Sequence, residues 1–118
     1  ASDLSRFQLS SGNENLPPQL FARGQHINDR RALTRLSLSA DDIGISLEPL
    51  LQSSFANCIP VTVTAIKKDN YGVLITCDLA QQEVFIHITE GSQERLGIAT
   101  GQQVYAIFKA GALDVLSS

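Results

Sequence analysis

The stretch that decides the fold is residues 86–97, IHITEGSQERLG, which reads as a strand running straight into one short turn of helix. Over residues 84–88 the β-branched side chains occupy every second position, which is the period that a strand requires. Thr89 then suits the N-cap of a helix, Leu96 gives that helix one apolar anchor, and Gly97 is well placed to end it. A helix start with backbone N–H groups and neighbouring hydroxyls is a candidate anion site.

Strand patterns surround this stretch. Hairpin loops are predicted at residues 67–72, KKDNYG, and at residues 80–82, AQQ. The strands predicted beside them span residues 59–66, 73–79, 83–88, 104–109 and 112–116. Short antiparallel strands with a single helical turn predict an all-β fold, a small OB-like antiparallel β-barrel, because closure hides strand edges that would otherwise be exposed.

The first part of the chain is less regular. Residues 1–26 contain a polar loop signal and the pair Pro17-Pro18, which excludes a helix interior and a central strand. Two interpretations stay open for this segment. It is either a piece that packs against another part of a larger protein or a mobile tail.

A short strand pair is predicted next, at residues 33–38 and 43–47, with a turn between the two strands. Pro49 and the polar residues after it mark a boundary. We therefore expect residues 1–50 to form a linker and the preceding strand pair, and residues 51–118 to form the barrel.

Composition narrows the class of protein. The chain has 118 residues and 43% apolar residues, so it is the size of one domain with a modest core. The net charge is −3, and no run of basic residues exceeds the pairs Arg30-Arg31 and Lys67-Lys68. A nucleic-acid partner is therefore not expected, since such a surface needs a concentrated basic field.

The two cysteines, Cys58 and Cys77, lie far apart in predicted strands, without a C-x-x-C pattern or clustered histidines. They are interpreted as buried, reduced core residues rather than as a metal site or a disulfide. No apolar run approaches the roughly 20 residues of a membrane-spanning helix, and the N-terminus lacks a signal-peptide pattern. A cytoplasmic chain is the expectation.

Short motifs then occur in order between residues 53 and 116: SFAN at 54–57, ITEGS at 88–92, LGI at 96–98 and FKA at 108–110. Their combination resembles the molybdate-binding MOP, or TOBE, domain. Upstream, residues 36–47 resemble the strand pair that precedes this domain in the ATP-binding subunits of molybdate ABC transporters. The chain is thus similar to the C-terminal regulatory part of such a subunit.

The resemblance implies a cytoplasmic regulatory domain, peripheral to the inner membrane, that senses molybdate or tungstate at domain or subunit interfaces. It implies a homodimer, an attached ATPase domain and, through that domain, a membrane permease. It implies no cofactor and no metal other than the molybdenum of the oxyanion. The chain itself is not expected to be an enzyme, because it contains no P-loop motif.

The same resemblance implies six oxyanion-binding residues: Ser54, Asn57, Thr89, Ser92, Lys109 and Ala110. Molybdate is a tetrahedral dianion without a proton at neutral pH, so a site that offers only hydrogen-bond donors accepts it. Thr89 and Ser92 supply hydroxyls beside backbone N–H groups, and Lys109 supplies a positive charge. Ser54 and Asn57 add neutral donors from the other end of the barrel, across a subunit interface.

Each of these residues has a structural alternative. Thr89 can be only an N-cap, Ser92 an ordinary first-turn residue, Lys109 a solvated edge charge, and Asn57 a turn residue. His87 is more typical of a half-buried strand residue than of a ligand or a general base.

Two further functions stay open beside the oxyanion sensor. One is a structural dimerisation scaffold without ligand, because the chain has Ala56 where many family members carry arginine. A second departure from the family is Pro60, where glycine often starts the first strand. The other function is an OB-like nucleic-acid or protein adaptor that stacks bases on its strand aromatics, Tyr71, Phe85, Tyr105 and Phe108.

Overall fold

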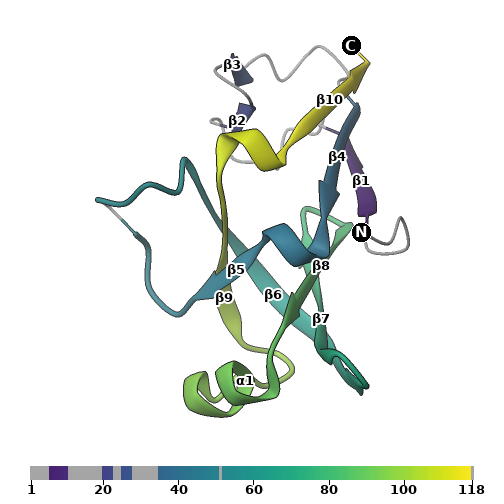
Figure 1. Ribbon diagram of the computed structural model, residues 1–118, viewed down its shortest axis with the longest axis vertical. Helices are drawn as coiled ribbons and strands as arrows, with labels where there is room; N and C mark the ends of the chain where they lie inside the picture. Colours follow the sequence, from purple (N-terminus) through teal and green to yellow (C-terminus); the bar gives the residue numbers. More distant parts are fainter. Residues whose placement is uncertain (1–5, 11–19, 23–24, 28–34, 51, 118) are drawn as a thin grey trace.

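The computed structural model describes residues 6–10, 20–22, 25–27, 35–50 and 52–117 (Figure 1). Its elements are β1 (Arg6–Ser10), β2 (Leu20–Ala22), β3 (Gln25–Ile27), β4 (Arg35–Ser39), the 3-10 turn η2 (Ala40–Asp42), β5 (Gly44–Ser46), β6 (Asn57–Asp69), β7 (Gly72–Leu79), β8 (Gln82–Ile88), α1 (Glu90–Leu96), β9 (Gln103–Phe108), the 3-10 turn η3 (Ala110–Ala112) and β10 (Asp114–Ser117). No helix in these ranges has the length and apolar character needed to cross a membrane.

The described strands form three antiparallel sheets. The largest has the order β5-β9-β6-β7-β8, the second has the order β1-β4-β10, and β2 pairs with β3. The predicted all-β class is confirmed, as is the single short helix, α1, between β8 and β9. The five-stranded sheet curls so that its edge strands β5 and β8 approach each other, but no backbone pairing joins them in the described residues.

Strand β6 bends the five-stranded sheet. Its first half, from Asn57 to Thr62, pairs with β9, and its second half, as far as Asp69, pairs with β7. A register shift between Val63 and Ala65 lies where the strand changes its main partner, and such bulges sharpen the local bend of a strand. Pro60 lies in the half that pairs only with β9, which is where a residue without an N–H group is tolerated.

One hydrophobic core joins the two larger sheets. In β7 every second residue from Val73 to Leu79 is buried, as the predicted period of two requires. Leu36 and Leu38 of β4, and Leu113 between η3 and β10, belong to the same cluster of buried residues. The three-stranded sheet β1-β4-β10 therefore packs against the five-stranded sheet.

The N-terminal strand β1 also packs on this chain. It pairs with β4 from Arg6 to Ser10, and the ring of Phe7 meets that of Phe85 in β8 edge to face, with centroids 5.5 Å apart. This geometry is one that aromatic pairs prefer. Most of the other residues in the range 1–26 lie outside the described residues.

The two strands predicted before the barrel exist as β4 and β5, but they do not pair with each other. Strand β4 lies between β1 and β10, whereas β5 pairs with β9 through Ile45 and Ala106. The turn η2 between them carries the chain from one sheet to the other, and the buried side chain of Ala40 anchors it. The division of the chain near residue 50 stays a prediction.

Both predicted hairpins are confirmed, but the first loop is shorter than the predicted range 67–72, because residues 67–69 continue β6 and Gly72 begins β7. The β6–β7 connection pairs Asp69 with Gly72, and the β7–β8 connection pairs Leu79 with Gln82. The two residues between Leu79 and Gln82 both have positive φ, 51° at Ala80 and 70° at Gln81. Two-residue hairpins favour positive φ at both loop residues. Glycine and asparagine usually fill these positions, whereas this chain has Ala80 and Gln81.

Both cysteines are free thiols. Cys77 is fully buried, as predicted, whereas Cys58 is only partly buried. Burial raises the pKa of the Cys77 thiol to about 11, so this side chain is a neutral core residue at physiological pH.

Candidate anion-binding site

The start of α1 presents two hydroxyls, from Thr89 and Ser92. The Thr89 side chain accepts a hydrogen bond from the backbone N–H of Ser92 at 3.1 Å, so the predicted N-cap is confirmed. Gly97, with φ of 66°, ends the helix, and its N–H donates to the carbonyls of Gln93 and Glu94. A single exposed turn of chain thus holds both hydroxyls at fixed positions.

Ser92 is left with its own proton to donate. Its hydroxyl oxygen accepts from the Thr89 hydroxyl at 3.0 Å and from the Arg95 guanidinium at 3.4 Å. A serine oxygen has two lone pairs and one O–H group, so these two contacts leave the O–H available. The arrangement suits an acceptor-only ligand.

Arg95 was missed by the sequence analysis. It follows Ser92 by three positions on α1, a spacing that places two side chains on the same face of a helix. This spacing is visible in the sequence and would have indicated Arg95 as a neighbour of Ser92. Its guanidinium brings positive charge to the two hydroxyls.

Asn57 and Lys109, two of the other predicted site residues, lie near each other at the opposite end of the five-stranded sheet. Asn57 opens β6 directly across from Phe108, which ends β9, and the exposed Lys109 follows as the N-cap of η3. Asn57 is only 2% exposed, so it is a buried strand residue rather than a turn residue. Ser54 is exposed three positions before it, and Ala110 is the first residue of η3.

The six predicted residues therefore fall into two groups, which we call the helix group (Thr89, Ser92) and the Lys109 group (Asn57, Lys109, Ala110, and Ser54 by its place three residues before Asn57). Strand β9 lies between them in the chain (Figure 1). At a rise of about 3.3 Å per residue, a strand of this length spans roughly 20 Å. An oxyanion a few ångströms across cannot contact both groups of one copy.

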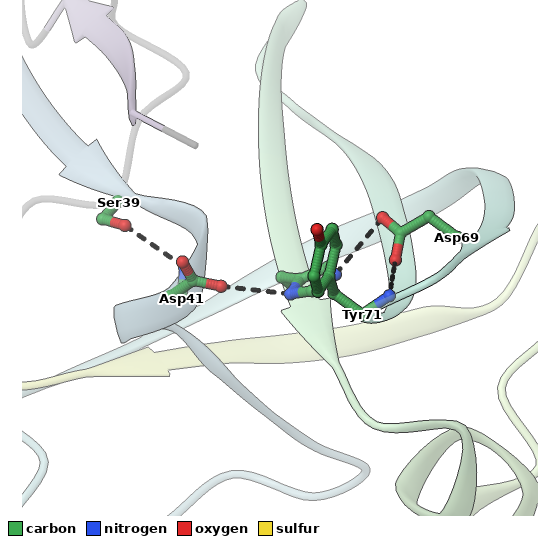
Figure 2. A network of polar contacts seen from close by, with 5 residues as sticks. Ser39, Asp41, Asp69 and Tyr71 are labelled. Carbon is green, nitrogen blue, oxygen red and sulfur yellow. Dashed lines mark hydrogen bonds and ion pairs between the residues drawn. The ribbon is translucent and has the colours of Figure 1, made fainter. Parts of the chain in front are cut away.

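His87 belongs to a separate polar network (Figure 2). Its Nδ1 lies 3.0 Å from Asp41 of η2, and its Nε2 lies 3.4 Å from Asp69 at the end of β6. The Tyr71 backbone N–H donates to Asp69 at 2.7 Å and is the main cause that lowers the pKa of this carboxyl. The contact with His87 lowers it further, while partial burial acts in the opposite direction.

Two kinds of alternative site find little support in the described part of the chain. No group of three histidine, cysteine or acidic side chains there is placed to hold a metal ion. Of the aromatics considered for base stacking, Phe108 is 2% exposed and Tyr71 is 88% exposed. Phe85 and Tyr105 are half-buried, so these side chains do not form a continuous exposed stacking surface.

Comparisons with known proteins fit this fold. The model of the TOBE domain matches residues 53–115, so the chain belongs to the TOBE domain family, and the resemblance seen in the sequence is confirmed. The matched region is thus a TOBE domain and not an ATPase domain.

The chain is similar to two bacterial transport proteins. It is 37% identical over 84 residues to the molybdenum import ATP-binding protein ModC 2 of Azotobacter vinelandii, a match that covers 70% of this chain and 24% of that protein. It is 35% identical over 81 residues to the molybdenum import ATP-binding protein ModC of Hahella chejuensis, a match that covers 67% of this chain and 23% of that protein. The chain therefore spans about a quarter of the length of these relatives.

The fold is also found in a solved structure. A crystal structure of the cytoplasmic molybdate-binding protein ModG with molybdate bound has a TM-score of 0.66 against this chain. The match covers 73% of this chain and 62% of that one, at 18% sequence identity. At this identity the likeness establishes the shared fold.

Proposed function

We propose that the chain is a regulatory domain that binds molybdate or tungstate and forms part of the ATP-binding subunit of an ABC transporter. The observation that carries this proposal is the 37% identity to ModC 2 over 84 residues. In this proposal the domain is cytoplasmic and has no catalytic activity of its own. It reports the oxyanion level to an attached ATPase domain and, through it, to a membrane permease.

The chemistry of the helix group supports an oxyanion ligand. The O–H of Ser92 and the guanidinium of Arg95 can each donate a hydrogen bond to an oxyanion. Molybdate and tungstate carry no proton at neutral pH, so every oxygen can accept from such groups. Monohydrogen phosphate carries a proton for which the guanidinium offers no acceptor, which costs binding free energy.

The Lys109 group adds the second half of the proposed site. Lys109 brings one positive charge, and Ala110 can contribute its backbone N–H, because the first residue of a helical turn has no partner within that turn. Since the two groups of one copy are too far apart, the anion binds between the helix group of one copy and the Lys109 group of a second. A homodimer then holds two equivalent sites.

Binding between copies gives the proposed sensor a mechanism. An anion that contacts both copies stabilises the dimer and the arrangement of subunits in which its donors converge. That arrangement can then be passed to the attached ATPase domains. Arg95 supplies a guanidinium to this site, although Ala56 lacks the arginine found at that position in many family members.

Mixing two variants tests the arrangement. Ser92→Ala keeps the Thr89 cap, which is made with a backbone N–H, and Lys109→Gln removes the charge but leaves a polar side chain. Each variant alone is expected to bind molybdate at least about tenfold more weakly. Ser92→Ala loses a hydroxyl donor, and Lys109→Gln loses a charged donor. Mixed dimers combine both changes in one site and leave the other site intact.

Equilibrium dialysis of the equimolar mixture should therefore recover about one quarter of the wild-type sites at wild-type affinity, the fraction expected for random pairing. The matched control is Ser92→Ala mixed with the double variant Ser92→Ala/Lys109→Gln, which has no intact site and should recover none. Recovery of no sites from the first mixture would mean that both groups act within one copy. Normal binding by both single variants would contradict the assigned residues.

A structural dimerisation scaffold is the second candidate, favoured by the alanine at position 56. Such a scaffold would form the same dimer whether or not an oxyanion is present. Sedimentation of the wild-type chain with and without molybdate separates the two functions, because only the sensor should associate more strongly when the anion is added.

A further inference from the structure

The five-stranded sheet has a seam between its edge strands β5 and β8. These strands approach without backbone pairing in the described residues, and η2, which leads into β5, lies against β8. The side chains of Ala40 and Ile43 are buried there. Contacts between side chains must therefore hold this seam where backbone hydrogen bonds do not.

His87 provides a polar contact across the seam. Its Nδ1 lies 3.0 Å from Asp41 Oδ1 on η2, and its Nε2 lies 3.4 Å from Asp69 Oδ2 at the β6–β7 hairpin (Figure 2). The ring is also close to the hairpin backbone, because a Cβ added at Gly72 would lie 3.5 Å from His87 Cε1. One ring thus connects three segments that are far apart in the sequence.

The hydrogen bonds that the His87 ring can donate in this geometry depend on how many protons the ring carries. A carboxylate only accepts hydrogen bonds, and a neutral imidazole carries a single N–H. A neutral His87 can therefore donate to Asp41 or to Asp69, and its other nitrogen then faces a carboxylate with a lone pair. The imidazolium donates to both carboxylates at once.

We propose that His87 is a proton-dependent clasp, whose imidazolium joins η2 to the β6–β7 hairpin and closes the seam beside β8. Loss of the proton leaves one of the two carboxylates without its donor and places two negative charges around a neutral ring. The clasp also fixes the end of β8, two residues before the Thr89 cap. It acts without any ligand, so a negative result for the clasp would not contradict the proposed function.

Other charged groups also lie on the elements around β8. Strand β5 has none, and η2 adds only the exposed Asp42. On β1, Arg6 donates to Ser37. Asp78 of β7 lies opposite Glu83 at the far end of β8, and Lys67 and Lys68 precede Asp69 on β6.

The direction of the pH effect follows from this geometry. The folded chain offers a protonated His87 two acceptors that the unfolded chain lacks, so the clasp contributes stability wherever the ring carries both protons. A neutral ring lacks one of these two donors, so the contribution is smaller at higher pH. The Tyr71 N–H lowers the pKa of Asp69, so this carboxylate remains ionised throughout a comparison between pH 5.5 and pH 8.

Urea unfolding of the full 118-residue chain at pH 5.5 and pH 8 tests the clasp. Lowering the pH should raise the unfolding midpoint of the wild type, relative to that of His87→Gln, by roughly 0.3 M, the size expected for a partly exposed ion pair. His26→Gln is the matched control and should keep the wild-type response. An identical pH response in the wild type and His87→Gln would overturn the proposal.

A second measurement covers the case in which His87→Gln does not fold. In an NMR titration of the wild type, the amide signals of Asp41 and Gly72 should shift with the same midpoint as the His87 ring. In Asp69→Asn, which changes an exposed side chain, the shift at Gly72 should shrink by at least about half. Signals at Asp41 and Gly72 that do not follow the His87 ring would also overturn the clasp.

Discussion

Replacing Phe108 with alanine is expected to lower the free energy of unfolding by about 3–5 kcal/mol, the range measured for large aromatic residues removed from cores. Phe108 is 2% exposed and ends β9, within the cluster that joins the two larger sheets. Removing its ring leaves a cavity between them. Since the whole free energy of unfolding of a small domain is about 5–15 kcal/mol, the urea concentration at the unfolding midpoint should fall by a large amount.

The matched control is Tyr71→Ala, which removes an aromatic ring that is 88% exposed at the β6–β7 hairpin. Its effect should stay within about 0.5 kcal/mol, as for most surface substitutions. A loss below about 1 kcal/mol for Phe108→Ala would mean that the two sheets do not share the core described above.

The second large effect is expected at Gly72, the first residue of β7. Its φ is +148°, and a Cβ built there would lie 2.4 Å from the carbonyl oxygen of Ile88 in β8. That neighbour is backbone, so the sheet itself would have to move. Gly72→Ala should therefore cost about 2 kcal/mol or more, measured by urea unfolding.

Gly91→Ala is the control for a glycine without such a constraint. Gly91 lies inside α1, and an added Cβ would meet only the Thr89 hydroxyl at 4.0 Å. Alanine there should raise stability by roughly 0.5–1 kcal/mol, because glycine is a poor residue for a helix interior. Equal effects at Gly72 and Gly91 would contradict the close approach of β7 and β8.

Local patterns were enough to predict much of the fold. Alternation of β-branched residues located β6 to β9, and the turn residues between them located the hairpins. The helix α1 was predicted from its cap at Thr89 and its end at Gly97, both of which the structure confirms. These features depend on neighbours within a few positions, so a single sequence reveals them.

Contacts between distant segments could not be predicted in the same way. Nothing in the local pattern of residues 35–39 indicates that β4 pairs with β1 on one side and β10 on the other. The contact between Asp41 and His87 joins positions 46 residues apart, and each residue alone reads as an ordinary polar side chain. Likewise, the sequence already placed Ser54 and Asn57 at the other end of the barrel from Thr89 and Ser92, but only the structure places Lys109 at that end, beside Asn57.

Isothermal titration of the wild-type chain with molybdate tests the proposed oxyanion sensor most directly, at protein concentrations where a dimer is populated. We predict saturable heat with molybdate and tungstate, at one anion per chain, and much weaker binding of phosphate under the same conditions. The absence of heat with both molybdate and tungstate would contradict the sensor. The dimerisation scaffold would then be the function that remains.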